Sequence, residues 1–316
     1  MNKWIPVLLT CCIILISGIY LFIPAKLSVS NNKIINCTIN GANRFLLDET
    51  KWIKWWPAGN ATVSNINNTK IPFNYEKYSF EINKIMYNKI LVTISDENGQ
   101  IKTNINILPV NMDTIVTQWQ YIIATSLNPV KRIIQYQQAK MLKKNMEAIL
   151  SELKSFLEKK SNIYGADIHE IISSDSTLIT TKLITTTYPV TTEIYQLIKT
   201  LRNYISSQQA NENNYPMLNV KKVSDSQFET MVAIPVDRKL EGSGKIFFSR
   251  FVPWRTLVAE VKGGNWTTEE ARRQMQLYIH DYNRTPYAIP FQSLITDRSL
   301  QTDTLKWVTK ICQAVS

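Results

Sequence analysis

The second half of the chain contains one pattern twice: TTEIYQLIKTLRNYI at residues 191–205 and TTEEARRQMQLYI at residues 267–279. Both copies begin with Thr-Thr-Glu, and the second begins 76 residues after the first. Apolar residues recur at helical spacing behind each tripeptide, so both copies are predicted to be amphipathic helices. In the second copy, Thr267 and Glu270 have the spacing of a capping box, which predicts the first turn of that helix.

Strands are predicted before and after each of these helices. Two fall within residues 164–188, and the others are expected at 217–223, 228–236, 245–252, 256–262, 288–296 and 305–312. The half-chain is therefore predicted to hold two copies of a strand–helix–strand–strand unit. Two copies related by a pseudo-twofold axis would leave a cleft on that axis, where small molecules commonly bind.

The first half shows a different order of elements. A short amphipathic segment carries Trp52, Trp55 and Trp56, and alternating strands follow between residues 75 and 124. A single long helix is then predicted from Pro129 to the domain boundary near residues 161–165; residues 131–160 hold eight Lys/Arg and three Glu, a net charge of +5. The predicted fold class is α+β, with an antiparallel sheet that grips a long C-terminal helix. The three Trp are interpreted as core, with a pocket lining as the alternative.

A charge-free run extends from Ile5 to Pro24, with Lys3 before it and Lys26 after it. About 20 apolar residues span a bilayer as a helix, which predicts a single-pass membrane anchor. A cleaved signal peptide fits less well, because Ile23 would stand where a small residue is expected. The side of the membrane that holds the remaining chain stays open. The predicted domains are thus residues 1–26, 27–160 and 162–316.

Composition excludes several classes of protein. The chain has 316 residues, of which 44% are hydrophobic and 19% are charged, and this globular composition excludes a disordered chain. Its formal net charge is +11. Its two His and four Cys have no zinc spacing, so no metal and no cofactor are predicted. Cys37 and Cys312 are interpreted as buried free thiols, with pairing in an oxidising compartment as the alternative. Because much of the positive charge lies on one helix and no helix-turn-helix segment is present, no nucleic-acid partner is predicted.

Residues 28–158 resemble the SRPBCC (START-like, polyketide cyclase-like) helix-grip superfamily in their strand into Trp52–Pro57, their alternating strands and their long closing helix. Residues 162–316 resemble the GyrI-like small-molecule-binding domain, also called the AraC effector-binding domain. That resemblance rests on LVAEVKGG (257–264), PFQSLITD (290–297) and KWVTKI (306–311). It implies binding of drugs and other amphipathic, often cationic, molecules. Some members of the family hydrolyse reactive cyclopropane-bearing compounds.

Many members of that family carry a Glu where this chain has Gln292. An amide offers a dipole in place of a charge, so neutral or weakly polar ligands are predicted. The predicted ligand-binding residues are Gln292, Glu260, Trp254, Tyr278 and Trp307. Glu260 shares a strand face with Thr256 and Val258, and is either a cleft carboxylate or a surface Glu paired with Lys262 or Arg255.

No catalytic residue is assigned. His280 and Asp281 are interpreted as a solvated pair, and Asp297, Arg298 and Asp303 as a structural polar turn. The predicted function is a membrane-anchored protein that captures amphipathic or hydrophobic small molecules in the cleft between the repeats, and also in the helix-grip cavity. The alternative is a hydrolase of reactive small molecules. The predicted partners are such a molecule and the membrane, through residues 5–24.

Overall fold

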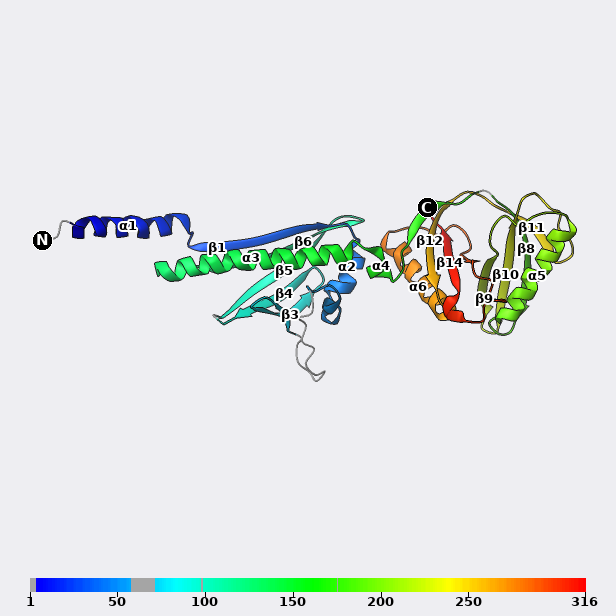
Figure 1. Cartoon of the computed structure of the whole chain (residues 1–316), viewed down its shortest axis with the longest axis horizontal. Helices are drawn as coiled ribbons and strands as arrows, with labels where there is room; N and C mark the ends of the chain where they lie inside the picture. The colour runs from blue at the N-terminus through cyan, green and yellow to red at the C-terminus, as the bar shows by residue number, and fades with distance from the viewer. Residues whose placement is uncertain (1–3, 58–71, 98, 175) are drawn as a thin grey trace. The chain divides into compact units, whose positions relative to one another are not determined.

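The structure is a computed structural model that describes residues 4–57, 72–97, 99–174 and 176–316 (Figure 1). The chain divides into two compact units, Met1–Lys159 and Lys160–Ser316. Each unit contains one antiparallel sheet with helices packed against it, so the fold is α+β. All the strand pairs described are antiparallel, which agrees with the alternating apolar and polar residues of the sequence.

The N-terminal helix α1 (Trp4–Phe22) corrects one sequence prediction. Within the described part of the chain, no helix has the length and apolar character needed to cross a membrane. This overturns the single-pass anchor over residues 5–24 and the membrane localisation that followed from it. The end of the predicted span belongs to the first unit instead: the Tyr20 hydroxyl donates to the Leu127 carbonyl, and buried Arg132 donates from Nε to the Ile23 carbonyl at 2.9 Å.

The first unit is a six-stranded sheet in the order β1-β6-β5-β4-β3-β2, with α3 (Pro129–Leu157) lying along it (Figure 1). Before β2 come the helix α2 (Ile39–Leu46) and the 3-10 helix η1 (Glu49–Lys54). The strands are β1 (Lys26–Ile35), β2 (Phe73–Tyr75), β3 (Tyr78–Met86), β4 (Lys89–Asp96), β5 (Gly99–Asn111) and β6 (Thr114–Ala124).

The core of the first unit forms between α3 and the sheet. The apolar stripe of α3 is buried, and its members are Leu142, Met146, Ile149, Leu150, Leu153 and Leu157. Ile134 and Met141 of the same helix are exposed. Trp52, Trp55 and Trp56 pack on one another and are buried, with the ring centroids of Trp52 and Trp55 4.8 Å apart. They therefore form core at the end of η1.

The second unit is an eight-stranded sheet in the order β11-β8-β10-β9-β13-β14-β12-β7. The order is symmetric about its centre, because β8–α5–β9–β10 is matched by β12–α6–β13–β14. The strands are β7 (His169–Ile172), β8 (Ser176–Thr185), β9 (Met217–Ser224), β10 (Gln227–Val236), β11 (Ile246–Phe251), β12 (Arg255–Lys262), β13 (Phe291–Leu294) and β14 (Val308–Ala314). The remaining short elements are α4 (Lys160–Tyr164) and the 3-10 helix η2 (Thr304–Lys306).

Each half of the second unit covers its strands with its own helix. In the first half, α5 (Thr191–Ser207) buries Ile194, Ile198, Leu201 and Ile205 against β8, β9 and β10. In the second half, α6 (Asn265–Asp281) buries Ala271, Met275 and Ile279 against β12 and β14. Helix α6 begins two residues before the predicted Thr267, with Gly264 at its cap position. The capping-box spacing therefore marked the helix but placed its start too late.

Helix α4 joins the second unit through Tyr164. This side chain is 1% exposed, donates from its hydroxyl to Asp281 Oδ2 at 2.8 Å, and packs edge-to-face on Tyr278. The segment just after the unit boundary therefore contributes directly to the core around α6.

We expect residues 160–316 alone to unfold in one cooperative transition, because they form one compact unit whose two halves share a single sheet. In that fragment, Tyr164→Ala should lower the free energy of unfolding by about 3–4 kcal/mol, the usual loss for a buried aromatic residue. Tyr215→Ala removes a half-exposed tyrosine and should change it by less than ~1 kcal/mol. Urea denaturation followed by circular dichroism measures both. An unfolded fragment, or equal losses from the two substitutions, would contradict this account.

Candidate ligand pocket in the second unit

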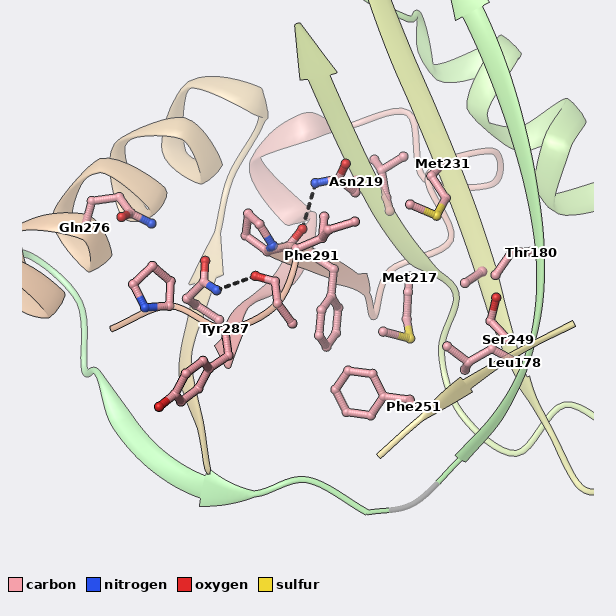
Figure 2. Close-up of a pocket in the computed structure, with 17 residues that line it drawn as sticks. Leu178, Thr180, Met217, Asn219, Met231, Ser249, Phe251, Gln276, Tyr287 and Phe291 are labelled. Atoms are coloured by element: carbon pink, nitrogen blue, oxygen red, sulfur yellow. Dashed lines mark hydrogen bonds between the residues drawn. The ribbon is translucent and has the colours of Figure 1, made fainter. Parts of the chain in front are cut away.

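A pocket of about 770 Å³ lies over the centre of the second sheet, where the two halves meet (Figure 2). We call it the apolar pocket. It is lined mainly by strand residues of both halves and by the segment 286–290, and it extends to Gln276 of α6. The side chains used below are Leu178, Thr180, Met217, Asn219, Met231, Ala233, Ser249, Phe251, Tyr287, Phe291 and Gln313.

Strand parity explains why these residues face the pocket. On β9, Met217 and Asn219 line it and Val220 belongs to the helix-side core, while Leu218 belongs to that core and also reaches the pocket lining. The same alternation holds on β10, where Met231 and Ala233 line the pocket. Successive side chains of a strand point to opposite faces. The pocket therefore occupies the strand face that α5 and α6 leave uncovered.

One row of residues crosses the sheet through the centre of this face. Its members are paired from strand to strand, in the order Thr180, Ala233, Met217, Ser293, Lys310 and Glu260. The part of the row under the apolar pocket consists of a small hydroxyl, a methyl group and a thioether. These short or flexible side chains leave volume above the sheet, and Met adapts readily to irregular apolar shapes.

Aromatic rings form the walls of the apolar pocket. Phe251 and Phe291 face each other edge-on, with ring centroids 5.7 Å apart, and they come from different halves of the unit. Tyr287 forms another part of the wall and is backed by Trp254, at 5.4 Å between centroids. Such rings bury large apolar areas with few rotatable bonds, which suits recognition of a planar or bulky apolar group.

Two amides hold the remaining wall in place. Asn219 Nδ2 donates to the Pro290 carbonyl at 2.7 Å, and Gln313 Nε2 donates to the Ala288 carbonyl at 2.8 Å (Figure 2). Both bonds fix the segment 286–290 over the sheet. The described lining residues of the apolar pocket include no charged side chain. Its polarity thus comes from amides, hydroxyls and backbone groups.

An adjoining cavity of about 400 Å³ shares Leu178, Met217, Phe251 and Phe291 with the apolar pocket. Lys310 and His169 line this second cavity. Lys310 Nζ lies 3.7 Å from Glu260 Oε2, and both side chains are substantially exposed. An exposed pair at this distance contributes little to stability, so it leaves the Lys310 charge largely available at the cavity.

The five predicted ligand-binding residues occupy different places. Glu260 is on the face predicted from strand alternation, but it pairs with Lys310 and not with Lys262 or Arg255. Trp254 is 43% exposed and supports Tyr287 from outside the pocket. Tyr278 is buried in the core around α6.

Gln292 and Trp307 are also buried. Gln292 is 9% exposed. Its neighbours Phe291 and Ser293 point to the pocket side of the sheet, so the Gln292 side chain points to the helix side, as Leu294 does. Trp307 Nε1 donates to the Gln301 carbonyl at 2.8 Å, and its ring lies under Arg298. The described lining of the apolar pocket includes none of the five. Ligand contact by these residues stays a prediction.

The pocket residues that the sequence analysis missed had a signal in the strand pattern. Phe291 lay inside a motif already singled out, one residue from Gln292. Met217 and Met231 lie on strands whose positions were predicted correctly, at positions that face the pocket. Assigning them to one face required the pairing of β9 with β13, which no local pattern contains.

The described residues include no cluster of three or more His, Cys, Asp or Glu that could hold a metal ion. Cys312 lines the adjoining cavity and Cys37 lies in the first unit; both are buried and free. Burial raises the pKa of each thiol to about 12. The thiolate, which is the reactive form, is therefore strongly disfavoured at neutral pH.

Comparison with known proteins gives structural similarities only. No family model matches the chain, and no curated protein matches it. A complex of EcmrR with DNA is similar over 60% of this chain and 72% of that one, at 16% identity and a TM-score of 0.44. The EcmrR C-terminal domain is similar over 48% of this chain and 98% of its own, at 13% identity and a TM-score of 0.41. A hydrolase from Listeria innocua is similar over 47% and 91%, at 9% identity and a TM-score of 0.37.

The partners predicted from the sequence need correction on two counts. The predicted membrane contact through residues 5–24 is wrong, because no helix among the described residues is long and apolar enough to span a bilayer. The exclusion of nucleic acid was too strong, because the similar structures include a protein–DNA complex. The DNA in that complex is a partner of EcmrR.

We expect Cys37 and Cys312 to resist alkylation in the folded chain. At pH 8 a thiol with a pKa of about 12 is a thiolate in roughly one molecule in ten thousand. Exposed Cys11 and Cys12 serve as internal controls and should react first. Iodoacetamide labelling followed by peptide mass spectrometry measures this order, and all four should react in denaturant. Native labelling of Cys312 as fast as Cys11 would show that the adjoining cavity exposes its thiol.

Proposed function

We propose that the second unit binds an uncharged or weakly polar amphipathic small molecule in the apolar pocket. The observation that carries this proposal is the pocket's chemistry: about 770 Å³ lined by methionines, aromatic rings and amides, without a charged side chain among its described lining residues. A pocket of this volume accommodates a drug-sized molecule. A cation placed there would lose its hydration without gaining a counter-charge.

The alternative function, hydrolysis of a reactive small molecule, has less support. Glu260 was the carboxylate considered for that chemistry. It lies outside the apolar pocket and pairs with Lys310, with its side chain more than half exposed. An exposed, ion-paired carboxylate that is not part of the pocket lining is a poor general base for a substrate held among Phe251, Phe291 and Tyr287.

For the first unit we propose a helix-grip fold of the START-like kind. Its support is the order of elements: β1, two short helical segments, five further strands, and a long helix that packs on the sheet. The rings of Trp52, Trp55, Trp56, Phe73 and Phe80 are buried and pack on one another beside η1, as a core does. We therefore assign ligand binding to the second unit.

Filling the apolar pocket should abolish binding of a neutral lipophilic dye. We expect Ser249→Trp, on the pocket face of β11, to weaken Nile red binding by at least tenfold, or about 1.4 kcal/mol. Ser224→Trp places the same side chain at the exposed end of β9 and is the matched control. Fluorescence titration of the full chain measures both. A lipophilic cation of similar size should bind the unmodified chain more weakly than Nile red. Unchanged dye affinity in the pocket variant would refute the proposed site.

A further inference from the structure

Arg298 is a buried cation without a buried counter-charge. It follows β13 and is 7% exposed. Its guanidinium lies 4.7 Å above the Trp307 ring, and one of its nitrogens donates to Thr309 Oγ1 at 2.8 Å. Its Nε is buried and has no hydrogen-bond partner among the described residues. A hydroxyl and an aromatic face offset only part of the cost of removing a guanidinium from water.

The carboxylates around Arg298 bind other groups. Asp297 Oδ1 accepts from the Ser299 backbone NH at 3.0 Å, and its Oδ2 accepts from Arg202 at 3.4 Å. Glu212 pairs with Arg202 at 2.9 Å. Burial lowers the pKa of Arg298, and the groups that partly offset this are the tyrosines 195 and 188. A buried arginine usually has a carboxylate partner. The described partners of the Arg298 guanidinium are instead the Trp307 ring and the Thr309 hydroxyl.

Arg298 also lines a separate pocket of about 590 Å³ along α5, on the helix side of the sheet. We call it the Arg298 pocket. Lys199 and Arg202 line it as well, and Thr191, Thr192 and Ser299 contribute hydroxyl groups. Its described lining includes no acidic side chain. Thr191 and Thr192 form the first turn of the 17-residue α5, where the Glu193 carboxylate already accepts from the Val190 NH at 2.9 Å, so the positive charge of the pocket comes from its basic side chains.

We propose that the Arg298 pocket binds a phosphoryl group, either free phosphate or the phosphate of a larger molecule, with Arg298 as its buried counter-charge. Arg202 is already paired with Glu212 and Asp297, so Arg298 and Lys199, together with several hydroxyl donors, are the groups that suit a tetrahedral dianion. The site is distinct from the apolar pocket in residues and in sheet face. It does not depend on what the apolar pocket binds.

The test compares the full chain with Arg298→Met, which removes the charge but keeps an apolar chain over Trp307. With the unmodified chain, inorganic phosphate should raise the melting temperature above that in sodium chloride of equal ionic strength. Without phosphate, Arg298→Met should melt at the same temperature or higher, because the uncompensated charge is gone. It should also lose the phosphate-specific rise. Arg273→Met removes an exposed cation of α6 and should behave like the unmodified chain.

Calorimetric titration with inorganic phosphate and with phenyl phosphate gives the affinity directly. We expect Arg298→Met to weaken both by at least about tenfold, as for loss of a charge-assisted contact. Lys199→Gln changes an exposed residue that should leave folding intact, and should weaken both by about threefold. Tighter binding of phenyl phosphate would identify a larger phosphorylated ligand, and equal binding would identify phosphate itself. Absence of a phosphate-specific response in the unmodified chain, or its persistence in both variants, would overturn the proposal.

Discussion

The short antiparallel pairing of β9 with β13 holds the second unit together as one sheet. It pairs Leu218 with Gln292 and Met217 with Ser293, and the Leu294 NH extends it to the Pro216 carbonyl at 2.9 Å. Every other strand pair of that sheet lies within one half, or joins β7 to β12 at the edge. Because side chains alternate, this one register decides which residues of both halves share a face. A slip by one residue would turn the β13 side chains over relative to those of β9, which would put Leu294 on the pocket face and Phe291 on the core face.

The apolar pocket follows from how the two helices are used. Each helix covers the strands of its own half, and the two cores are separate clusters around α5 and around α6. Neither helix covers the other face of the central strands. That face carries apolar and small side chains, so segment 286–290 and the rings of Phe251 and Tyr287 enclose volume over it. The fold thereby produces a concave apolar surface without exposing a flat one.

Much of this architecture was predictable from local patterns. Helical periodicity located α3, α5 and α6, and alternation located most strands to within a few residues, because both signals lie within a short window. Alternation also placed Glu260 on the correct face. Its partner Lys310 was missed because the pairing of β12 with β14 joins residues 50 positions apart. The same reason explains why Gln292 was selected over Phe291: motif position identified the strand, but the facing of its residues depends on β9.

Two further predictions, for the N-terminal apolar run and for Arg298, missed contacts with residues elsewhere in the chain that the local sequence does not contain. The charge-free run at the N-terminus gave no sign that Arg132, more than a hundred residues later, would bind the Ile23 carbonyl and stack on Tyr20. Arg298 was interpreted only as part of a structural polar turn, and nothing in the sequence indicated that its guanidinium packs on Trp307 and donates to Thr309. In both cases a distant aromatic ring accompanies the arginine, and a guanidinium that stacks on a ring is buried more readily than a lysine ammonium.

The two pockets of the second unit lie on opposite faces of the sheet, and the strand register decides which side chains reach each of them. Phe291 lines the apolar pocket and Arg298 lines the pocket along α5, and only six residues separate them. Tyr195 of α5 fixes the segment between them, accepting from the Arg298 NH at 2.6 Å and donating to the Thr296 carbonyl at 3.3 Å. The chain therefore crosses from the apolar face to the charged face within one short connection. Because the cation lies on the helix side, the apolar pocket keeps a lining free of charge, and a neutral ligand there meets no ionic group that its binding would desolvate.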